Sequence, residues 1–125
     1  MTFHDGLEEH LGAIRRRDID GLAATLPADD RIVLITSDGR LVRSAKEFLA
    51  LHRDWFAAGG WELGTEFVEV FESADLGVAV LKLDYRDTGP GGKPVREESY
   101  LTLVFRRQGE KWVMVQDQNT PVRPR

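Results

Sequence analysis

The sequence predicts an α+β fold, and three observations support this prediction. Apolar residues recur at helical spacing in three segments of the first half of the chain, whereas the second half consists mainly of extended, β-like runs. Helices that precede strands in this way are typical of an antiparallel sheet covered by helices on one face. The length of 125 residues and the 42% hydrophobic content suit a single domain, residues 1–125, with one packed core.

Three helices are expected, each with a recognisable start or end. Thr2 is expected to cap the first helix. Asp18 is expected to cap a short second helix, which Pro27 ends. Ser44 is expected to cap the third helix, and Gly59-Gly60 ends it. The apolar faces of the three helices consist of Phe3, Leu7, Leu11 and Ile14, then Ile19, Leu22, Ala23 and Leu26, and finally Phe48, Leu51, Trp55 and Phe56.

Extended segments are expected between and after the helices. Two short ones cover residues 31–35 and 41–42. The longer strands are predicted at 61–71, 76–86, 98–107 and 111–120. The loop 87–94 is rich in glycine, but it lacks the Gly-Lys-Ser/Thr ending and the following helix of a phosphate-binding loop. We therefore interpret it as a hairpin loop.

The last strand changes character along its length. It is apolar over 112–115 and wholly polar over 116–119, although nothing in this stretch breaks a strand. Pro121 then ends it, since proline cannot donate a ladder hydrogen bond. Such a strand leaves a packed core and enters either water or a cavity that needs hydrogen-bonding groups.

The closing segment 102–121, Thr-Leu-Val-Phe-Arg-Arg-Gln-Gly-Glu-Lys-Trp-Val-Met-Val-Gln-Asp-Gln-Asn-Thr-Pro, resembles the closing hairpin of the nuclear transport factor 2-like superfamily. SnoaL-like proteins and the association domain of calcium/calmodulin-dependent kinase II are most similar in pattern. Those proteins carry His-x-His in the last strand, and here Gln116 and Gln118 occupy the two His positions. The resemblance implies a cone-shaped, curved antiparallel sheet, mixed at its edge, that wraps around the N-terminal helices.

A cavity inside this cone is the expected site. Side chains alternate along a strand, which places Asp117 and Asn119 on one side together with Val113 and Val115. The resemblance makes that side concave. The full inward set would then be Leu81, Leu83 and Tyr85, Leu101, Leu103 and Phe105, and Val115, Asp117 and Asn119, with His52 and Trp55 contributed by the third helix. A β-bulge between 112 and 117 would instead turn Gln116 and Gln118 inward.

The resemblance also indicates the charge of the ligand. Leu83, Leu103 and Asn119 stand where the kinase association domain has pocket arginines. This replacement argues against an anionic ligand and favours a small, neutral and largely apolar molecule. The predicted ligand-binding residues are Trp55, Leu83, Leu103 and Asn119.

Two functions are compatible with these residues. One is a non-catalytic binding domain. The other is an enzyme like ketosteroid isomerase or the SnoaL-like cyclases, with Asp117 as general base and Tyr85 or His52 donating to an oxyanion. The first helix lacks the tyrosine that the isomerase carries there. Fold alone does not choose between the two functions.

Each of these residues also has a purely structural interpretation. Asp117 can be solvated at a strand end or paired with an arginine, and this is about twice as common as a catalytic role. His52 on a helix is most often half-buried and hydrogen-bonded. Trp55 is more often a core residue than a ligand platform, because large aromatic side chains dominate core burial. Tyr85 can be a surface residue of its strand.

The second apolar face of the long strands predicts a homodimer. The helices of so short a chain cannot cover both faces of the sheet, so a second copy is expected on the uncovered one. We predict that this face carries Tyr100, Thr102, Val104, Trp112 and Met114.

Composition excludes several other classes of function. The chain has no cysteine, which rules out disulfides, thiolate nucleophiles and cysteine-ligated metals. The net charge of −4 is mild, and interspersed charges give no electrostatic case for nucleic acid or an anionic membrane. The three histidines show no metal-ligand spacing, so we assign no metal and no cofactor. The start of the chain is unlike a signal peptide, and we expect a cytoplasmic protein.

Overall fold

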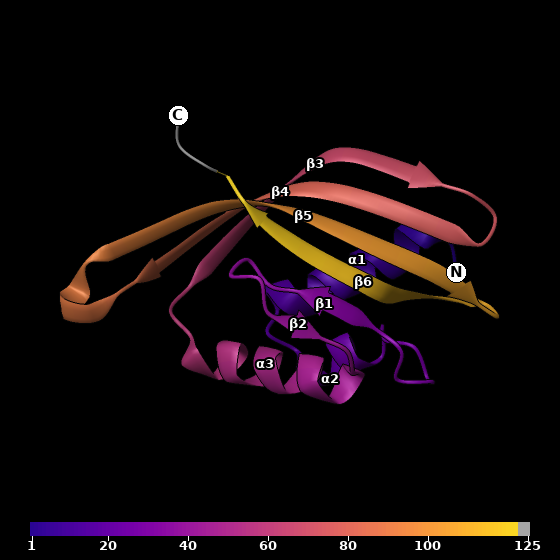
Figure 1. Ribbon diagram of the computed structural model, residues 1–125, viewed down its shortest axis with the longest axis horizontal. Coiled ribbons are helices and arrows are strands. Elements are labelled where there is room, and N and C mark those ends of the chain that lie inside the picture. Colours follow the sequence, from indigo (N-terminus) through magenta and orange to yellow (C-terminus); the bar gives the residue numbers. More distant parts are fainter. Residues whose placement is uncertain (123–125) are drawn as a thin grey trace.

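A strongly curved, six-stranded sheet wraps around three helices in the computed structural model, which describes residues 1–122 (Figure 1). The helices are α1 (Phe3–Arg15), α2 (Ile19–Ala23) and α3 (Ala45–Ala58). The strands are β1 (Val33–Ile35), β2 (Leu41–Val42), β3 (Glu62–Glu72), β4 (Leu76–Thr88), β5 (Pro94–Gln108) and β6 (Lys111–Pro121), with a 3₁₀ turn, η1 (Pro90–Gly92), between β4 and β5. The α+β prediction is confirmed.

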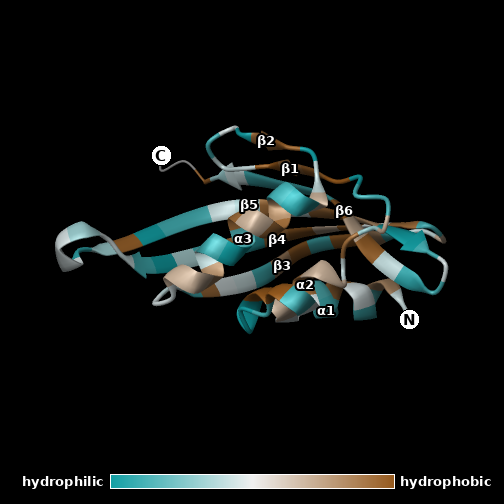
Figure 2. Cartoon of the chain, turned by 90° about the horizontal axis from the view of Figure 1, so that it is seen from below, coloured by the Kyte–Doolittle hydropathy of each residue, from teal (hydrophilic) through white to brown (hydrophobic). Residues whose placement is uncertain are grey.

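The strand order in the sheet is β2-β1-β6-β5-β4-β3. All neighbouring pairs are antiparallel except β1 and β6, which run parallel, so the sheet is mixed near one edge. The β4–β5 hairpin is longer than predicted, because pairing continues to Thr88 opposite Pro94. A proline is tolerated there as the first residue of a strand. This hairpin projects beyond the body of the molecule and is mostly hydrophilic (Figures 1 and 2).

Local capping sets the helix starts where the sequence predicted them. Thr2 and Asp5 form a reciprocal capping box at the start of α1. The side chains of Asp18 and Ser44 accept hydrogen bonds from the first turns of α2 and α3. The α3 helix ends before Gly59, whose φ of 62° lies in the left-handed region that favours glycine. Ser44 and Gly59 thus set the two ends of α3, and α3 forms one wall of the candidate site.

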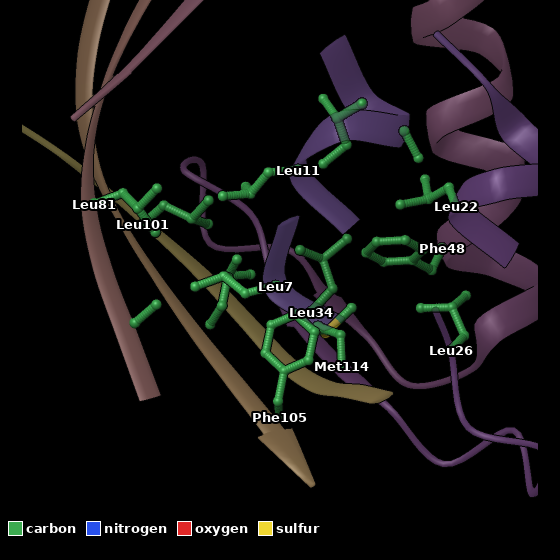
Figure 3. Close-up of a cluster of buried hydrophobic side chains, with 14 of the residues drawn as sticks. Leu7, Leu11, Leu22, Leu26, Leu34, Phe48, Leu81, Leu101, Phe105 and Met114 are labelled. Carbon is green, nitrogen blue, oxygen red and sulfur yellow. The ribbon is translucent and has the colours of Figure 1, made fainter. Parts of the chain in front are cut away.

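The core lies between the helices and the concave face of the sheet (Figure 3). Leu7 and Leu11 of α1 meet Leu81 and Leu101 of the central strands, while Phe48 of α3 closes the other side. The ring of Phe3 packs against those of Phe105 and Trp112, with centroids 5.6 and 5.4 Å apart. The largest fully buried side chains are those of Phe3, Phe48, Phe105, Leu7, Leu22, Leu81, Leu103, Met114, His10, Val42 and Val113.

A β-bulge at Val115 corrects the predicted orientation of β6. Val104 pairs with Gln116, but the next residue, Phe105, pairs with Met114, so Val115 is an extra residue in β6. Because of this extra residue, Met114 and Asp117 both face the concave side. Val113, predicted to face inward, lies opposite Arg106 instead.

The bulge also corrects the predicted dimer face. Trp112 and Met114 are 6% and 0% exposed and belong to the core of the chain itself, so they cannot contribute to an outer surface. Tyr100, Thr102 and Val104 remain on the convex face.

Candidate functional site

A cavity of about 630 Å³ opens on the concave side, between α3 and the strands β4, β5 and β6. His52 and Trp55 reach it from α3, and Asp117 and Asn119 reach it from β6. Tyr85 lines it from β4. The structure thus brings the five polar and aromatic residues singled out from the sequence together around one space, as strand alternation and the resemblance implied.

The two predicted leucines differ in position. Leu83 lines the cavity. Leu103 is fully buried and belongs to the core, where it lies directly opposite Asp117 in the β5–β6 ladder. Leu103 is inward-facing, as predicted, but its side chain is fully covered by core packing and does not reach the cavity surface.

Asp117 is the buried carboxylate of this cavity. Its residue is 4% exposed, and its neighbours across the ladders are the buried Leu34 and Leu103. None of the ion pairs within residues 1–122 involves it. Burial without a compensating cation raises the pKa of Asp117 from its ordinary 3.8 to about 7. The group therefore exchanges protons near neutral pH.

Asn119 and Ser99 support this carboxylate. The Asn119 Nδ2 donates to Asp117 Oδ1 over 3.4 Å, and Ser99 Oγ donates to Asn119 Oδ1 over 3.5 Å. The ionised carboxylate only accepts and therefore faces the NH2 end of the Asn119 amide, while the Ser99 hydroxyl meets the Oδ1 end. Sequence reasoning missed Ser99, although it lies on the inward side of β5, two residues before Leu101, where alternation alone points to it.

His52 is held in one tautomer. Its Nδ1 lies 2.8 Å from the Phe48 carbonyl oxygen. A carbonyl oxygen only accepts, so Nδ1 carries the hydrogen. Burial lowers the pKa of His52, an effect only partly opposed by the Phe48 hydrogen bond, and the ring is neutral. Its Nε2 is therefore an acceptor, and the neutral ring has no free N–H to offer an oxyanion.

The remaining wall is aromatic. The Trp55 ring stacks on Trp61 at 4.2 Å, and the Tyr85 ring lies 6.2 Å from Trp55. The Tyr85 hydroxyl donates to Asp87 Oδ2 over 2.8 Å. Burial, followed by this hydrogen bond, raises the pKa of Tyr85. Its hydrogen is already engaged by Asp87, so Tyr85 offers the cavity its ring.

The two glutamines that replace the family's histidines lie outside the site. Gln116 and Gln118 pair with Val104 and Thr102 on the convex side, and Gln116 Nε2 donates to Gln118 Oε1 over 3.3 Å.

The described residues contain no group of three or more His, Asp or Glu side chains placed to hold a metal ion. None of the helices within residues 1–122 is long and apolar enough to cross a membrane.

Comparison with known proteins agrees with this architecture. A ketosteroid isomerase-like protein from Erwinia carotovora atroseptica superposes with a TM-score of 0.80 at 18% identity, covering 98% of this chain and 95% of that one. A provisionally assigned calcium/calmodulin-dependent protein kinase type II association domain from Thiobacillus denitrificans gives 0.80 at 21% identity, covering 96% and 94%. A provisionally assigned dehydratase of the NTF2-like family from Streptomyces avermitilis gives 0.81 at 18% identity, covering 97% and 94%.

At these identities the structural similarities establish the fold alone, which is the cone-shaped NTF2-like fold. No curated protein matches the sequence. The family model of the SnoaL-like domain matches residues 5–122, which is nearly the whole chain. The chain therefore belongs to the SnoaL-like domain family.

Proposed function

We propose that this domain binds a small, neutral and largely apolar molecule in the concave cavity. The observation that carries the proposal is a cavity of about 630 Å³, walled by aromatic and aliphatic side chains, whose buried acid lacks a cationic partner within the described chain. Apolar walls with a few convergent polar groups are typical of small-molecule sites. Arg96 reaches the rim, but its guanidinium already pairs with Asp84 and Glu98.

Electrostatics supports a neutral rather than an anionic ligand. An anion in this cavity would lie near Asp117 in a region of low dielectric, where like charges repel strongly. It would also lose its hydration without gaining a cation. A neutral molecule avoids both costs and still gains apolar contact with Trp55, Leu83 and Tyr85.

A size-matched pair of probes tests this proposal. Calorimetric titration at pH 8 should show 2-naphthamide binding at least tenfold more tightly than 2-naphthoate. The variant Leu83→Trp, which fills the cavity, should abolish binding, whereas Arg86→Trp on the opposite face of β4 should not. Preferential binding of the carboxylate, or binding unaffected by Leu83→Trp, would exclude the proposed site.

A second candidate function is proton transfer, and the pKa of Asp117, near 7, is the specific observation that favours it. In this reaction the Asp117 carboxylate would take a proton from a carbon next to a ketone, leaving an enolate, and then return a proton to that carbon. Binding remains the first proposal, because Tyr85 and His52 have no free hydrogen to stabilise the enolate.

Deuterium exchange distinguishes binding from proton transfer. If Asp117 is a base, 2-tetralone in D₂O should lose its α-protons faster with the wild-type protein than with Asp117→Asn, as followed by NMR. Equal exchange rates in both proteins, combined with tight binding of neutral probes, would leave the domain as a binding module.

We also propose a homodimer formed by the convex face of the sheet. Phe71, Leu76 and Tyr100 on this face are 61%, 50% and 42% exposed, and the half-buried Val78 and Val104 lie between them. A contiguous apolar surface of this kind favours burial against a second copy. Light scattering at micromolar concentration should give a dimer for the wild type and a monomer for Val104→Lys. A wild-type monomer, or an interface built from the helices, would refute the proposal.

A further inference from the structure

We propose that His52 Nε2 accepts a hydrogen bond from the ligand, and that the cavity therefore selects apolar molecules carrying a hydroxyl or N–H group. This inference rests on the proposed function, because it names the chemical class that the same cavity takes. It reverses the donor role that the resemblance suggested for His52.

The first step is the fixed tautomer of the ring. The Phe48 carbonyl engages Nδ1–H at 2.8 Å, one helical turn before His52 in α3. The imidazole is also stacked on the Phe48 ring at 4.0 Å, and the Trp55 and Phe56 rings meet it at 69° and 79°. These contacts hold the ring in place, and a 180° flip about the Cβ–Cγ bond would put Cδ2–H where Nδ1–H lies and lose the hydrogen bond to Phe48.

The second step is that Nε2 is accessible and without a partner. No hydrogen bond joins it to any of residues 1–122. Within residues 1–122, His10 Nε2 is the one buried side-chain nitrogen or oxygen that has no hydrogen-bond partner. His52 Nε2 has no partner either, so it is not buried. Because the His52 side chain lines the cavity, its free lone pair is available there.

The third step is the balance of donors and acceptors around the cavity. The Tyr85 hydrogen is engaged by Asp87, and the Asn119 amide is engaged by Asp117 and Ser99. The Asn119 amide keeps a second N–H, and the protonated form of Asp117 can also donate, whereas His52 Nε2 can only accept because Nδ1 carries the ring hydrogen. A ligand with a donor satisfies His52 Nε2, whereas a ligand with acceptors alone leaves its lone pair desolvated and unpaired.

A matched pair of probes isolates the donor. 2-Naphthol and 2-methoxynaphthalene share the same bicyclic ring, and both are neutral at pH 7, but only the naphthol has an O–H. The methoxy compound is the more apolar, so burial alone would favour it. We expect calorimetric titration to show 2-naphthol binding roughly three- to tenfold more tightly, the gain of one neutral hydrogen bond.

Three variants assign the effect to a residue. His52→Phe keeps a ring for the stack on Phe48 but removes the acceptor, and it should abolish the preference for naphthol. His4→Phe makes the same change on the exposed face of α1 and should leave the preference intact. Asp117→Asn tests the competing acceptor, because the preference disappears in this variant only if the naphthol hydroxyl donates to Asp117. A preference that survives in His52→Phe but disappears in Asp117→Asn would place the donor at Asp117 and overturn the inference.

The wild-type protein provides an independent measurement if His52→Phe fails to fold. The ¹⁵N resonance of an unprotonated imidazole nitrogen moves upfield when it accepts a hydrogen bond, so His52 Nε2 should shift with 2-naphthol and not with 2-methoxynaphthalene. Equal affinity for the two probes, with no such shift, overturns the inference while leaving the binding function in place. If neither these probes nor 2-naphthamide bind, the proposed function itself fails.

Discussion

Asp117→Asn is the substitution whose effect on stability follows most directly from the structure. The pKa of Asp117 rises from 3.8 in an ordinary environment to about 7 when it is buried in the folded chain. At about 1.4 kcal/mol for each pKa unit, this difference of about 3 units corresponds to about 4 kcal/mol. This figure is an upper bound, because the carboxyl borders the open cavity and is not sealed in the core.

The sign follows from proton linkage. The folded state binds the Asp117 proton more tightly than the unfolded state, so this contribution to stability is fully present below pH 3.8 and is lost as the pH rises to 7. Asparagine keeps the shape and does not titrate. Asp117→Asn should therefore be close to wild type in stability near pH 4 and more stable by up to about 4 kcal/mol at pH 8.

Urea unfolding of both proteins at a series of pH values measures this difference. Burial lowers the pKa of His10 to about 3. His10 therefore acts in the opposite direction, because it destabilises the folded state as the pH falls below 6.5. It is present in both proteins and cancels in the subtraction. Asp54→Asn, an exposed change on α3, is the control for the loss of a carboxylate as such. A difference between Asp117→Asn and wild type that does not change with pH would refute the reasoning.

Two further predictions concern the packing that supports the site. Trp112→Ala should lower the free energy of unfolding by on the order of 3 kcal/mol, because the ring is 6% exposed and packs on Phe3; an unchanged melting temperature would show that it is not buried. Gly6→Ala should destabilise by roughly 1–3 kcal/mol in urea unfolding, since the added methyl group would lie 2.7 Å from Trp112 Cβ. Gly12→Ala, also on α1, is the control for Gly6→Ala. Its added methyl group meets only the flexible end of the Arg16 side chain, and helix propensity favours alanine over glycine. Equal effects of the two substitutions would contradict the close approach of α1 to β6.

Features set by local chemistry were predictable from the sequence. The helix caps at Thr2, Asp18 and Ser44 lie where predicted. Each capping side chain accepts a hydrogen bond from the backbone of the helical turn that follows it, so the cap depends only on residues close by in the sequence. The start of β5 was predicted four residues late, at Glu98 rather than at Pro94, because it depends on pairing with a strand that lies across the hairpin.

The site was predictable only to the extent that strand alternation held. Asp117 and Asn119 face the cavity as predicted, but Trp112 and Met114 face the core, because the bulge at Val115 reverses alternation between the two halves of β6. Nothing in the local sequence marks that bulge. In the structure, the Met114 N–H donates to the Thr25 carbonyl oxygen over 2.8 Å, a contact between distant parts of the chain.

Titration of the Asp117 carboxyl carbon by ¹³C NMR, with and without 2-naphthamide, tests the binding account most directly. In the free protein the midpoint should lie near pH 7, since the carboxyl is buried without a cation. A neutral ligand removes more water from the cavity, so the midpoint should rise further when 2-naphthamide is bound. A midpoint near 4, or one that the amide leaves unchanged at saturation, would contradict a buried acid that faces a ligand cavity.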